Sequence, residues 1–481
     1  MRSSTNPFII RQRPEGRQLY LFGIVLVAVL GGLLFGYDTA VISGAEKGLQ
    51  QFFLSAQDFR YTDALHGFTT SSALIGCIIG AFLSGLLAHS LGRKKSLFIA
   101  GLLFFISAWG SFAPETGLLP KGEPTLTLLV VFNIYRILGG IGVGLASAIC
   151  PMYIAEIAPA DRRGALVSWN QFAIIFGQLV VYFVNFLIVR AHVNDPAVQE
   201  WTQQVGWRVM FVSECVPAAT FALLILLVPE SPRYLALMGR DEEALAVLGK
   251  LHRMERAIEI VKQIHETATE KREPLLSFGW MVIFVGIMLS VFQQIVGINA
   301  VLYFAPRIFE SMGVGSPMVF TVLMGVVNIS FTLLAIFTVE RLGRKPLLIV
   351  GSLLMAVGAM GVALTNMVEL PAWVAVASIL LYSASFMFSW GPICWVYMSE
   401  LFPNTIRSEA TAVAVAFQWI SNFAVSSTFV PLYNYSHALA YIIYGVICVV
   451  AAVFVWKLVP ETKGKTLEEI TVLWRKKSGT R

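Results

Sequence analysis

Residues 91–95 read LGRKK, and residues 342–346 read LGRKP. The same doubling occurs twice more: YIAEIAPADRR at 153–163 returns as YMSELFPNTIR at 397–407, and PESPR at 229–233 returns as PETKG at 460–464. The motifs keep their order, and each returns about half a chain later. Long apolar stretches separate them, so the duplicated unit is predicted to be a membrane domain. Two related membrane halves around a central site are typical of secondary transporters.

The composition supports this interpretation. Hydrophobic residues make up 57% of the 481 residues and charged residues 13%, whereas a typical soluble domain has roughly 25% charged residues. The mean hydropathy is +0.72. The net charge of +6 comes without a basic stripe, so a nucleic acid partner is not expected. The five cysteines lie in apolar segments without CxxC spacing and are interpreted as small core residues: Cys77, Cys150, Cys215, Cys394 and Cys448.

The predicted fold is an all-α membrane protein with twelve transmembrane helices in two pseudo-symmetric six-helix halves, joined by a cytoplasmic helical linker. The expected spans are 19–43, 66–90, 95–113, 126–150, 165–190 and 207–229, then 278–303, 317–338, 346–368, 372–398, 409–432 and 437–459. The corresponding domains are an N-terminal tail (1–18), the first half (19–230), the linker (231–277), the second half (278–460) and a C-terminal tail (461–481). The first span is too long for a cleaved signal peptide and lacks an A-x-A site.

Lysine and arginine counts in the short loops predict the orientation. One side carries Arg93, Lys94, Lys95, Arg162, Arg163, Arg341, Arg344, Lys345 and Arg407, and the other carries chiefly Lys47, Arg60, Lys121, Arg190 and Arg307. The richer side and both termini are therefore expected to be cytoplasmic. Residues 241–266 in the linker have helical apolar spacing and predict short amphipathic helices against that face. His252 and His265 lie here without ligand-spaced companions, so solvated positions are favoured over a metal site.

The motifs together resemble the sugar porter family of the major facilitator superfamily, from about Leu21 to Glu469. They are GRKK and GRKP, PMYIAEIAP, RRG, PESPR, QQIVGINAVLYF, WGPICWVYMSELFP and VPETKGKTLEE. Fuller strings, including LLFGYDTAVISG, YRILGGIGVGLAS, NQFAIIFGQ and WKLVPETKGKTLEE, are most similar to bacterial D-xylose:proton symporters. The resemblance implies a major facilitator fold, import of a neutral monosaccharide with a proton, no cofactor, a functional monomer and a bacterial inner membrane location.

Asp38 lies well inside the first span, where an ionised carboxylate is costly. Arg136, inside the fourth span, is the available cation. The two side chains form either a fixed ion pair that locks packing or a proton switch, in which protonation of Asp38 releases Arg136. The resemblance places Glu214 near this pair. Because FGYDTAV aligns with VGINAV in the repeat, Asp38 corresponds to Asn299, an amide that cannot titrate.

Neutral hydrogen-bonding groups and aromatic rings in the spans suit a sugar, and their lack of charge argues against sugar phosphates. For any one amide, hydrogen bonding between helices is the alternative explanation. Gln171 and Gln178 are two helical turns apart on one face. The full set matches positions that the family uses for sugar contact: Phe35, Gln171, Gln178, Gln293, Gln294, Asn299, Tyr303, Asn328, Gly391, Trp395, Gln418 and Trp419. Pro392 after Gly391 predicts a break in the tenth span beside Trp395.

Two further patterns have competing explanations. GGIGVG at 139–144 lies in a span without strand–turn–helix context, so close helix packing is favoured over a nucleotide site. Neither a P-loop nor an HExxH or GxSxG string occurs, and no enzyme class is supported. Acid–base pairs flank the spans on the arginine-rich side: Glu156 with Arg163, Glu400 with Arg407, and Glu340 with Arg344. They are either ordinary surface charges or, with Arg93, Glu230, Arg233 and Glu461, a network that closes the cytoplasmic side in the outward-facing state. His89 replaces the acid expected in the first GRKK motif, and Tyr234 replaces a tryptophan.

A proton-linked importer of D-xylose is the favoured function. A proton-linked glucose or galactose symporter is the alternative, because the same amides and aromatic rings serve these sugars. Passive uniport is less favoured, since passive members of the family tend to lack the acid at the Asp38 position. A sugar sensor is least favoured, because sensors of this fold carry long cytoplasmic tails and only 21 residues follow Pro460 here.

Overall fold

The computed structural model describes residues 14–475, apart from positions 116, 118, 160–161, 192–197, 269–272, 369, 404, 464–468, 471 and 473. In the first half, the helices are α1 Pro14–Leu54, α2 Asp63–Ser90, α3 Arg93–Phe112, α4 Leu126–Ile157, α5 Arg163–Arg190, α6 Val198–Trp201, a π-helix Thr202–Gly206, α7 Trp207–Val212 and α8 Cys215–Ile225. The linker contains α9 Pro232–Leu237, α10 Asp241–Leu251 and α11 Met254–Ala268.

In the second half, the helices are α12 Trp280–Ile295, α13 Ile298–Tyr303, α14 Ala305–Ser311, α15 Pro317–Leu342, α16 Arg344–Val368, α17 Ala372–Phe388, α18 Trp390–Leu401, α19 Arg407–Tyr435 and α20 His437–Leu458. Twelve helical segments of the described residues are long and apolar enough to cross a membrane. They match the twelve predicted spans, and α1 runs eleven residues beyond the predicted end of the first span. Large apolar side chains such as Phe82, Leu223, Phe337 and Trp456 are exposed on them, as expected for surfaces that face lipid.

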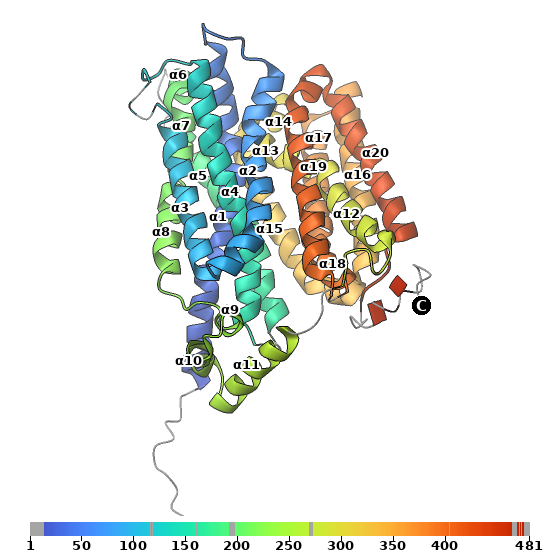
Figure 1. Ribbon diagram of the computed structural model, residues 1–481. Coiled ribbons are helices and arrows are strands. Elements are labelled where there is room, and N and C mark those ends of the chain that lie inside the picture. The colour runs from blue at the N-terminus through green and yellow to red at the C-terminus, as the bar shows by residue number, and fades with distance from the viewer. Residues whose placement is uncertain are drawn as a thin grey trace, which may run out of the picture.

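The two halves stand side by side, with the first half drawn in blue to green and the second in yellow to red (Figure 1). Within the first half, α2 and α3 pack on α4 and α1 packs on α5; within the second, α16 packs on α17 and α20. Between the halves, α2 packs on α19 and α5 packs on α15. These are the second span with the eleventh and the fifth with the eighth, which exchange when one repeat is superposed on the other. The pairing therefore obeys the symmetry that the repeated motifs predict.

The linker helices α9–α11 lie at one end of the bundle, which we call the linker end (Figure 1). They bury a small core of their own, formed by Leu235, Ala236, Ala244, Leu248, Ala257 and Val261. The predicted amphipathic helices of residues 241–266 are thus confirmed as α10 and α11. We call the opposite end, which includes the α1–α2 and α14–α15 loops, the far end.

The repeated glycines of the two GRK motifs start α3 and α16 in the same way. Gly92 and Gly343 have φ of 89° and 88°, a conformation that favours glycine. A β-carbon on Gly92 would also overlap the carboxylate of Glu230. That carboxylate accepts hydrogen bonds from the backbone N–H groups of Arg93 and Lys94. Glu461 accepts from Arg344 and Lys345 in the second half. Each half therefore caps the N-terminus of its third span with an acid from the end of its sixth span.

Two of the spans, the seventh and the tenth, are each broken into two helices. The seventh span divides at residues 296–297 into α12 and α13, and the tenth span divides at Ser389 into α17 and α18. The predicted break of the tenth span is thus confirmed, two residues before Gly391. Pro392 stands in the first turn of α18, where proline is tolerated because its missing N–H would have no partner within the helix. The GGIGVG segment packs closely on α2: a β-carbon on Gly140 would overlap the carbonyl of Ala73. This confirms the packing interpretation.

Candidate functional site

A central cavity lies between the two halves, and about 640 Å³ of space, open solvent included, lies among the side chains around it. The first half supplies Phe35, Thr39, Gln171, Ile174, Ile175 and Gln178; the second supplies Gln293, Gln294, Asn299, Leu302, Tyr303, Phe386, Met387, Gly391, Trp395, Gln418, Trp419 and Asn422. Eleven of the twelve residues predicted to contact sugar therefore line one cavity.

Four amides of the second half form a continuous hydrogen-bonded chain. Asn299 donates to Gln294 over 2.5 Å, and Gln294 donates to Gln293 over 3.3 Å. Gln418 also donates to Gln293. The side chain of Gln293 in turn donates to the backbone carbonyl of Trp390, over 3.1 Å, at the break between α17 and α18. The chain thus joins three spans and holds its members in fixed orientations along the cavity wall.

Three polar atoms of the cavity lining are buried and lack a hydrogen-bond partner among the described residues. They are Oε1 of Gln178, Oε1 of Gln418 and Nε1 of Trp419. Two acceptors and one donor are thus left for a bound molecule, and both halves contribute. Because an unsatisfied buried polar atom costs roughly 1–3 kcal/mol, a ligand with hydroxyl groups would gain by pairing with them.

Aromatic rings supply the apolar part of the cavity. Phe35 on α1 and Trp419 on α19 approach each other across the two halves, with ring centroids 5.7 Å apart. Trp395 lies on α18, just after the break in the tenth span. Together with the amides, the flat rings suit a molecule that has both hydroxyl groups and C–H faces. None of the lining residues is charged, so the cavity is matched to a neutral ligand.

Beside the cavity, a buried ion pair lies wholly within the first half. Arg136 on α4 donates to the Asp38 carboxylate over 2.6 Å and to the Asp38 backbone carbonyl over 3.2 Å. Asp38 is 0% exposed and Arg136 2%. The guanidinium also lies over the Phe211 ring, 5.0 Å from its centroid. Asp38 directly precedes Thr39, a lining residue, so a change at the pair can reach the cavity through α1.

Glu214 is the third buried charge that the sequence indicates, and it is 0% exposed. It lies at the junction of α7 and α8 and interacts electrostatically with Asp38 and Arg136. Neither of its carboxyl oxygens has a hydrogen-bond partner among the described residues, and the same holds for Oδ2 of Asp38. Two acids and one arginine thus share one apolar region. A single added proton would make this group neutral and would supply a donor for the oxygens that lack one.

One residue of the predicted sugar-contact set lies apart from the other eleven in this structure. Asn328, on α15, does not line the cavity: its side-chain oxygen accepts from Ser383 on α17 over 2.6 Å, and it is 1% exposed. Its amide therefore joins two helices of the second half, the alternative that the sequence left open for any one amide.

Sequence reasoning missed several lining residues, of which Thr39, Ile174, Ile175 and Asn422 follow from helical spacing. Each lies three or four residues from a predicted contact on the same helix, and such positions share a face. Leu302 also lies three residues from Asn299, but the short helix α13 that carries both begins at the break in the seventh span. Phe386 and Met387 lie just before the break in the tenth span, and nothing in their residue types points to them.

The acid–base pairs at the linker end differ from those predicted. Glu156 pairs with Arg93 over 2.8 Å, and Glu400 pairs with Arg344 over 2.9 Å. Arg407 instead donates to the backbone carbonyl of Phe402. Both pairs lie within their own half and consist of members of the predicted network, whose role in closing the cytoplasmic side stays a prediction.

Three further members of the predicted network need separate mention. The side chains of Arg163 and Glu340 lie outside the described residues. Arg233 is exposed. In the linker, Nε2 of His265 lies 3.0 Å from the carboxylate of Asp241. The predicted core placement of the cysteines is confirmed for four of them, whereas Cys215 is half-buried.

The chain matches known proteins over nearly its full length. Residues 24–474 match the family model described as "Sugar (and other) transporter". The D-xylose-proton symporter of Escherichia coli K12 is 50% identical, with 95% of this chain and 96% of that protein covered. The glucose facilitated diffusion protein of Zymomonas mobilis is 36% identical, with 96% and 99% covered. The solved inward-open structure of the Escherichia coli xylose transporter XylE has a TM-score of 0.84 and 49% identity, with 94% of this chain and 100% of that chain covered.

Proposed function

This chain belongs to the sugar transporter family. We propose that it imports D-xylose together with a proton by alternating access. The cavity carries the proposal: it is uncharged, it is completed by both halves, and it leaves two acceptors and a donor for a ligand with hydroxyl groups. The symporter of Escherichia coli, which shares half of its residues with this chain, is named for D-xylose and the proton.

The proton is proposed to bind at Asp38 and Glu214, opposite Arg136. In the ionised state this buried group has one negative charge in excess, and such a charge is costly inside a membrane. Taking up a proton removes the excess and weakens the hold of Asp38 on Arg136. Helix α1 carries both Asp38 and the lining residues Phe35 and Thr39. A rearrangement of the pair is therefore transmitted to the sugar cavity by one rigid element.

The linker end is proposed to be cytoplasmic, with both termini, and the far end extracellular. This orientation rests on the excess of lysine and arginine in the short loops of the linker end. The protein would lie in a bacterial inner membrane and act as a monomer, because one chain supplies every wall of the cavity. The Arg93–Glu156 and Arg344–Glu400 pairs would close the cytoplasmic side together when the protein faces outward.

A proton-linked hexose symporter is the second candidate, favoured by the similarity to a glucose facilitator. Xylose lacks the hydroxymethyl group at C5 that glucose carries, so a cavity that accepts xylose has no built-in clash with glucose. We therefore expect D-glucose to compete for the site. Passive uniport is disfavoured by the buried acids, which a passive carrier does not need.

The direct test is the pH of the medium around starved, de-energised cells that express the protein. Adding D-xylose should make the medium more alkaline, because each sugar carries a proton inward. Adding D-glucose with xylose should reduce the signal. Alkalinisation with glucose or galactose but none with xylose would refute the xylose assignment and leave the symporter assignment standing. Uptake of sugar without alkalinisation would refute proton coupling.

A further inference from the structure

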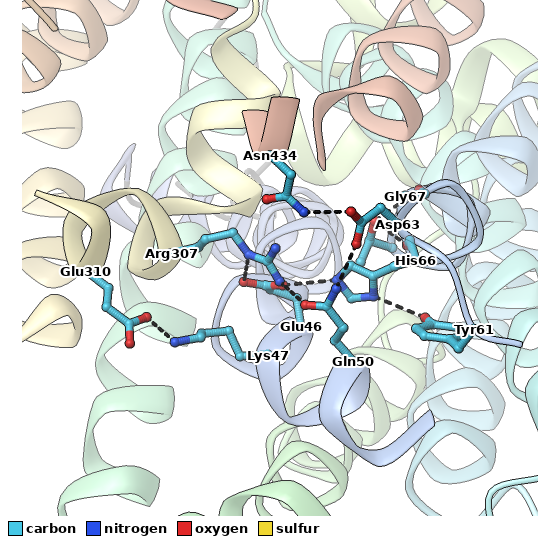
Figure 2. A network of polar contacts seen from close by, with 11 residues as sticks. Glu46, Lys47, Gln50, Tyr61, Asp63, His66, Gly67, Arg307, Glu310 and Asn434 are labelled. Carbon is cyan, nitrogen blue, oxygen red and sulfur yellow. Dashed lines mark hydrogen bonds and ion pairs between the residues drawn. The ribbon is translucent and has the colours of Figure 1, made fainter. Parts of the chain in front are cut away.

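A buried ion pair joins the two halves at the far end (Figure 2), and neither of its residues lines the sugar cavity. Glu46 lies on α1 and is 0% exposed, and Arg307 lies on α14 with 13% of its side chain exposed. Arg307 donates from Nε to Oε1 of Glu46 over 3.0 Å and from its Nη2 to Oε2 over 2.6 Å. This two-bond geometry is the strongest form of an arginine–carboxylate contact.

A histidine of the first half holds the same carboxylate. His66 on α2 is 0% exposed, and its Nε2 lies 3.1 Å from Oε2 of Glu46. Its Nδ1 lies 3.0 Å from the hydroxyl of Tyr61. A neutral imidazole has one donor and one acceptor, so Nε2 donates to Glu46 and Nδ1 accepts from Tyr61. The carboxylate thus has one partner from its own half and one from the other half.

The remaining groups around the pair are polar and mostly more exposed. Gln50 accepts from Arg307 and donates to Asp63, which also accepts from Asn434 of the second half. Lys47 and Glu310 form a second ion pair between the halves, with 40% and 52% of their side chains exposed. Burial, the largest single influence, lowers the pKa of the Arg307 guanidinium, but the charge and hydrogen bonds of Glu46, together with Asp63 and Tyr433, outweigh it and the pKa is raised. Arg307 therefore stays charged in the pair.

We propose that Glu46 and Arg307 form a far-end latch that holds the extracellular side of the transporter closed, with His66 as the residue that positions the Glu46 carboxylate. Opening this end moves α14 away from α1, so both bonds between Arg307 and Glu46 must break, together with the bond from Arg307 to Gln50. The contacts among Glu46, His66 and Tyr61 lie within the first half and can persist. The carboxylate then stays in place for Arg307 to bind again. The latch concerns conformation and holds whichever sugar is carried.

The burial of the two ion pairs decides which one matters. Removing one partner of a buried pair leaves an uncompensated charge, whereas an exposed pair contributes little because water solvates both charges. The Glu46–Arg307 pair should therefore dominate closure, and the Lys47–Glu310 pair, which also joins α1 to α14, serves as its matched control.

The test measures the separation of the two halves at the far end in the full-length protein. Spin labels are placed on cysteines that replace Gln57 and Ser316, which are exposed and lie in far-end loops of opposite halves. Cys215, the cysteine that is not fully buried, is replaced by Ala. Distances are measured by pulsed electron resonance in lipid nanodiscs without sugar. Arg307→Gln and Glu46→Gln should each raise the population with the longer distance several-fold, and Lys47→Gln should leave it unchanged.

Two further comparisons make the test specific. The Glu46→Gln/Arg307→Gln double variant should open no further than either single variant, because both remove the same interaction. His66→Leu, which removes the donor to Glu46, should also open the far end, whereas His66→Gln, which keeps a donor, should restore closure. Unchanged distances in both single variants, or an equal response in Lys47→Gln, would overturn the latch. Equal opening by both His66 variants would overturn the positioning role.

Discussion

Asp38 and Asn299 stand at matching positions of the two sequence repeats, in FGYDTAV and VGINAV, yet their surroundings differ. Asp38 lies in the continuous helix α1, is 0% exposed, and pairs with Arg136. Asn299 lies just after the break between α12 and α13, lines the cavity, and donates to Gln294. The acid is enclosed in its own half, and the amide lines the central cavity.

One repeated helix can therefore serve two tasks in the two halves. A carboxyl group and an amide have nearly the same shape, but only the carboxyl group changes its charge. Enclosing the acid beside an arginine makes proton uptake the event that alters packing, whereas an amide in a hydrogen-bonded chain can bind hydroxyl groups at any pH. The proposed division assigns the proton to the first half and most sugar contacts to the second.

The largest effect is expected when Asp38 is replaced by the amide that stands at the matching position of the second half. Asp38→Asn should abolish uphill accumulation of sugar and leave sugar binding largely intact, because the amide resembles the protonated acid. Accumulation is measured in energised vesicles, and binding is measured by calorimetry. A variant that still concentrates sugar against a gradient would show that Asp38 is not the coupling group.

The next largest effect is expected on the other side of the comparison. Gln294→Ala should weaken sugar binding by roughly 1–3 kcal/mol, because the hydroxyl groups it contacts lose their partner. Gln293→Ala and Asn299→Ala should act in the same direction, and none of the three should change the proton-to-sugar ratio. Calorimetry that finds unchanged affinity in all three would remove this stretch from the site.

A smaller effect should sharpen the role of the second acid. Glu214→Gln removes one of the two acids that share Arg136, and with it the excess negative charge that makes proton uptake by this buried group favourable. The external pH that gives half-maximal uptake should therefore shift toward acid, while sugar exchange without a gradient is retained. Initial uptake rates measured across a series of external pH values test this. An unchanged pH profile would reduce Glu214 to a structural group.

The smallest effect is expected for Asn328, which does not line the cavity in this structure. Asn328→Ala should leave sugar affinity within about twofold of the native value, because the side chain does not line the cavity. It should lower thermal stability, since Ser383 loses its acceptor and both atoms are buried. A loss of affinity as large as that of Gln294→Ala would return Asn328 to the binding site.

Much of the fold could be predicted because bilayer thickness fixes the length of an apolar span, and the repeated motifs fix the order of the two halves. Eleven of the cavity-lining residues could be predicted, because six of them are neutral amides inside apolar spans, which are unusual, and the others match positions that the family uses. Asn328 shows the limit: its residue type was right, but the rotation of α15 turns it toward Ser383. The partners in ion pairs between helices could not be predicted for a similar reason, because Arg344 and Glu400, which form such a pair, are far apart in the chain.

The far-end latch escaped prediction for a different reason. The predicted first span ends at residue 43, which leaves Glu46 outside it. The helix in fact continues to Leu54 and buries Glu46 completely. Hydropathy alone cannot detect this extension, because the carboxylate is made compatible with burial by Arg307, which is 261 residues away in the chain.

The acids that cap α3 and α16 also bear on how the protein is made. Glu230 caps a helix that begins 137 residues earlier, and Glu461 caps one that begins 117 residues earlier. During synthesis, each third span therefore leaves the ribosome long before its capping carboxylate exists. The cap can form only when the last span of that half has been delivered to the membrane. The cap at the membrane surface therefore forms only when its half is complete. The first half can form its cap before the second half has been translated.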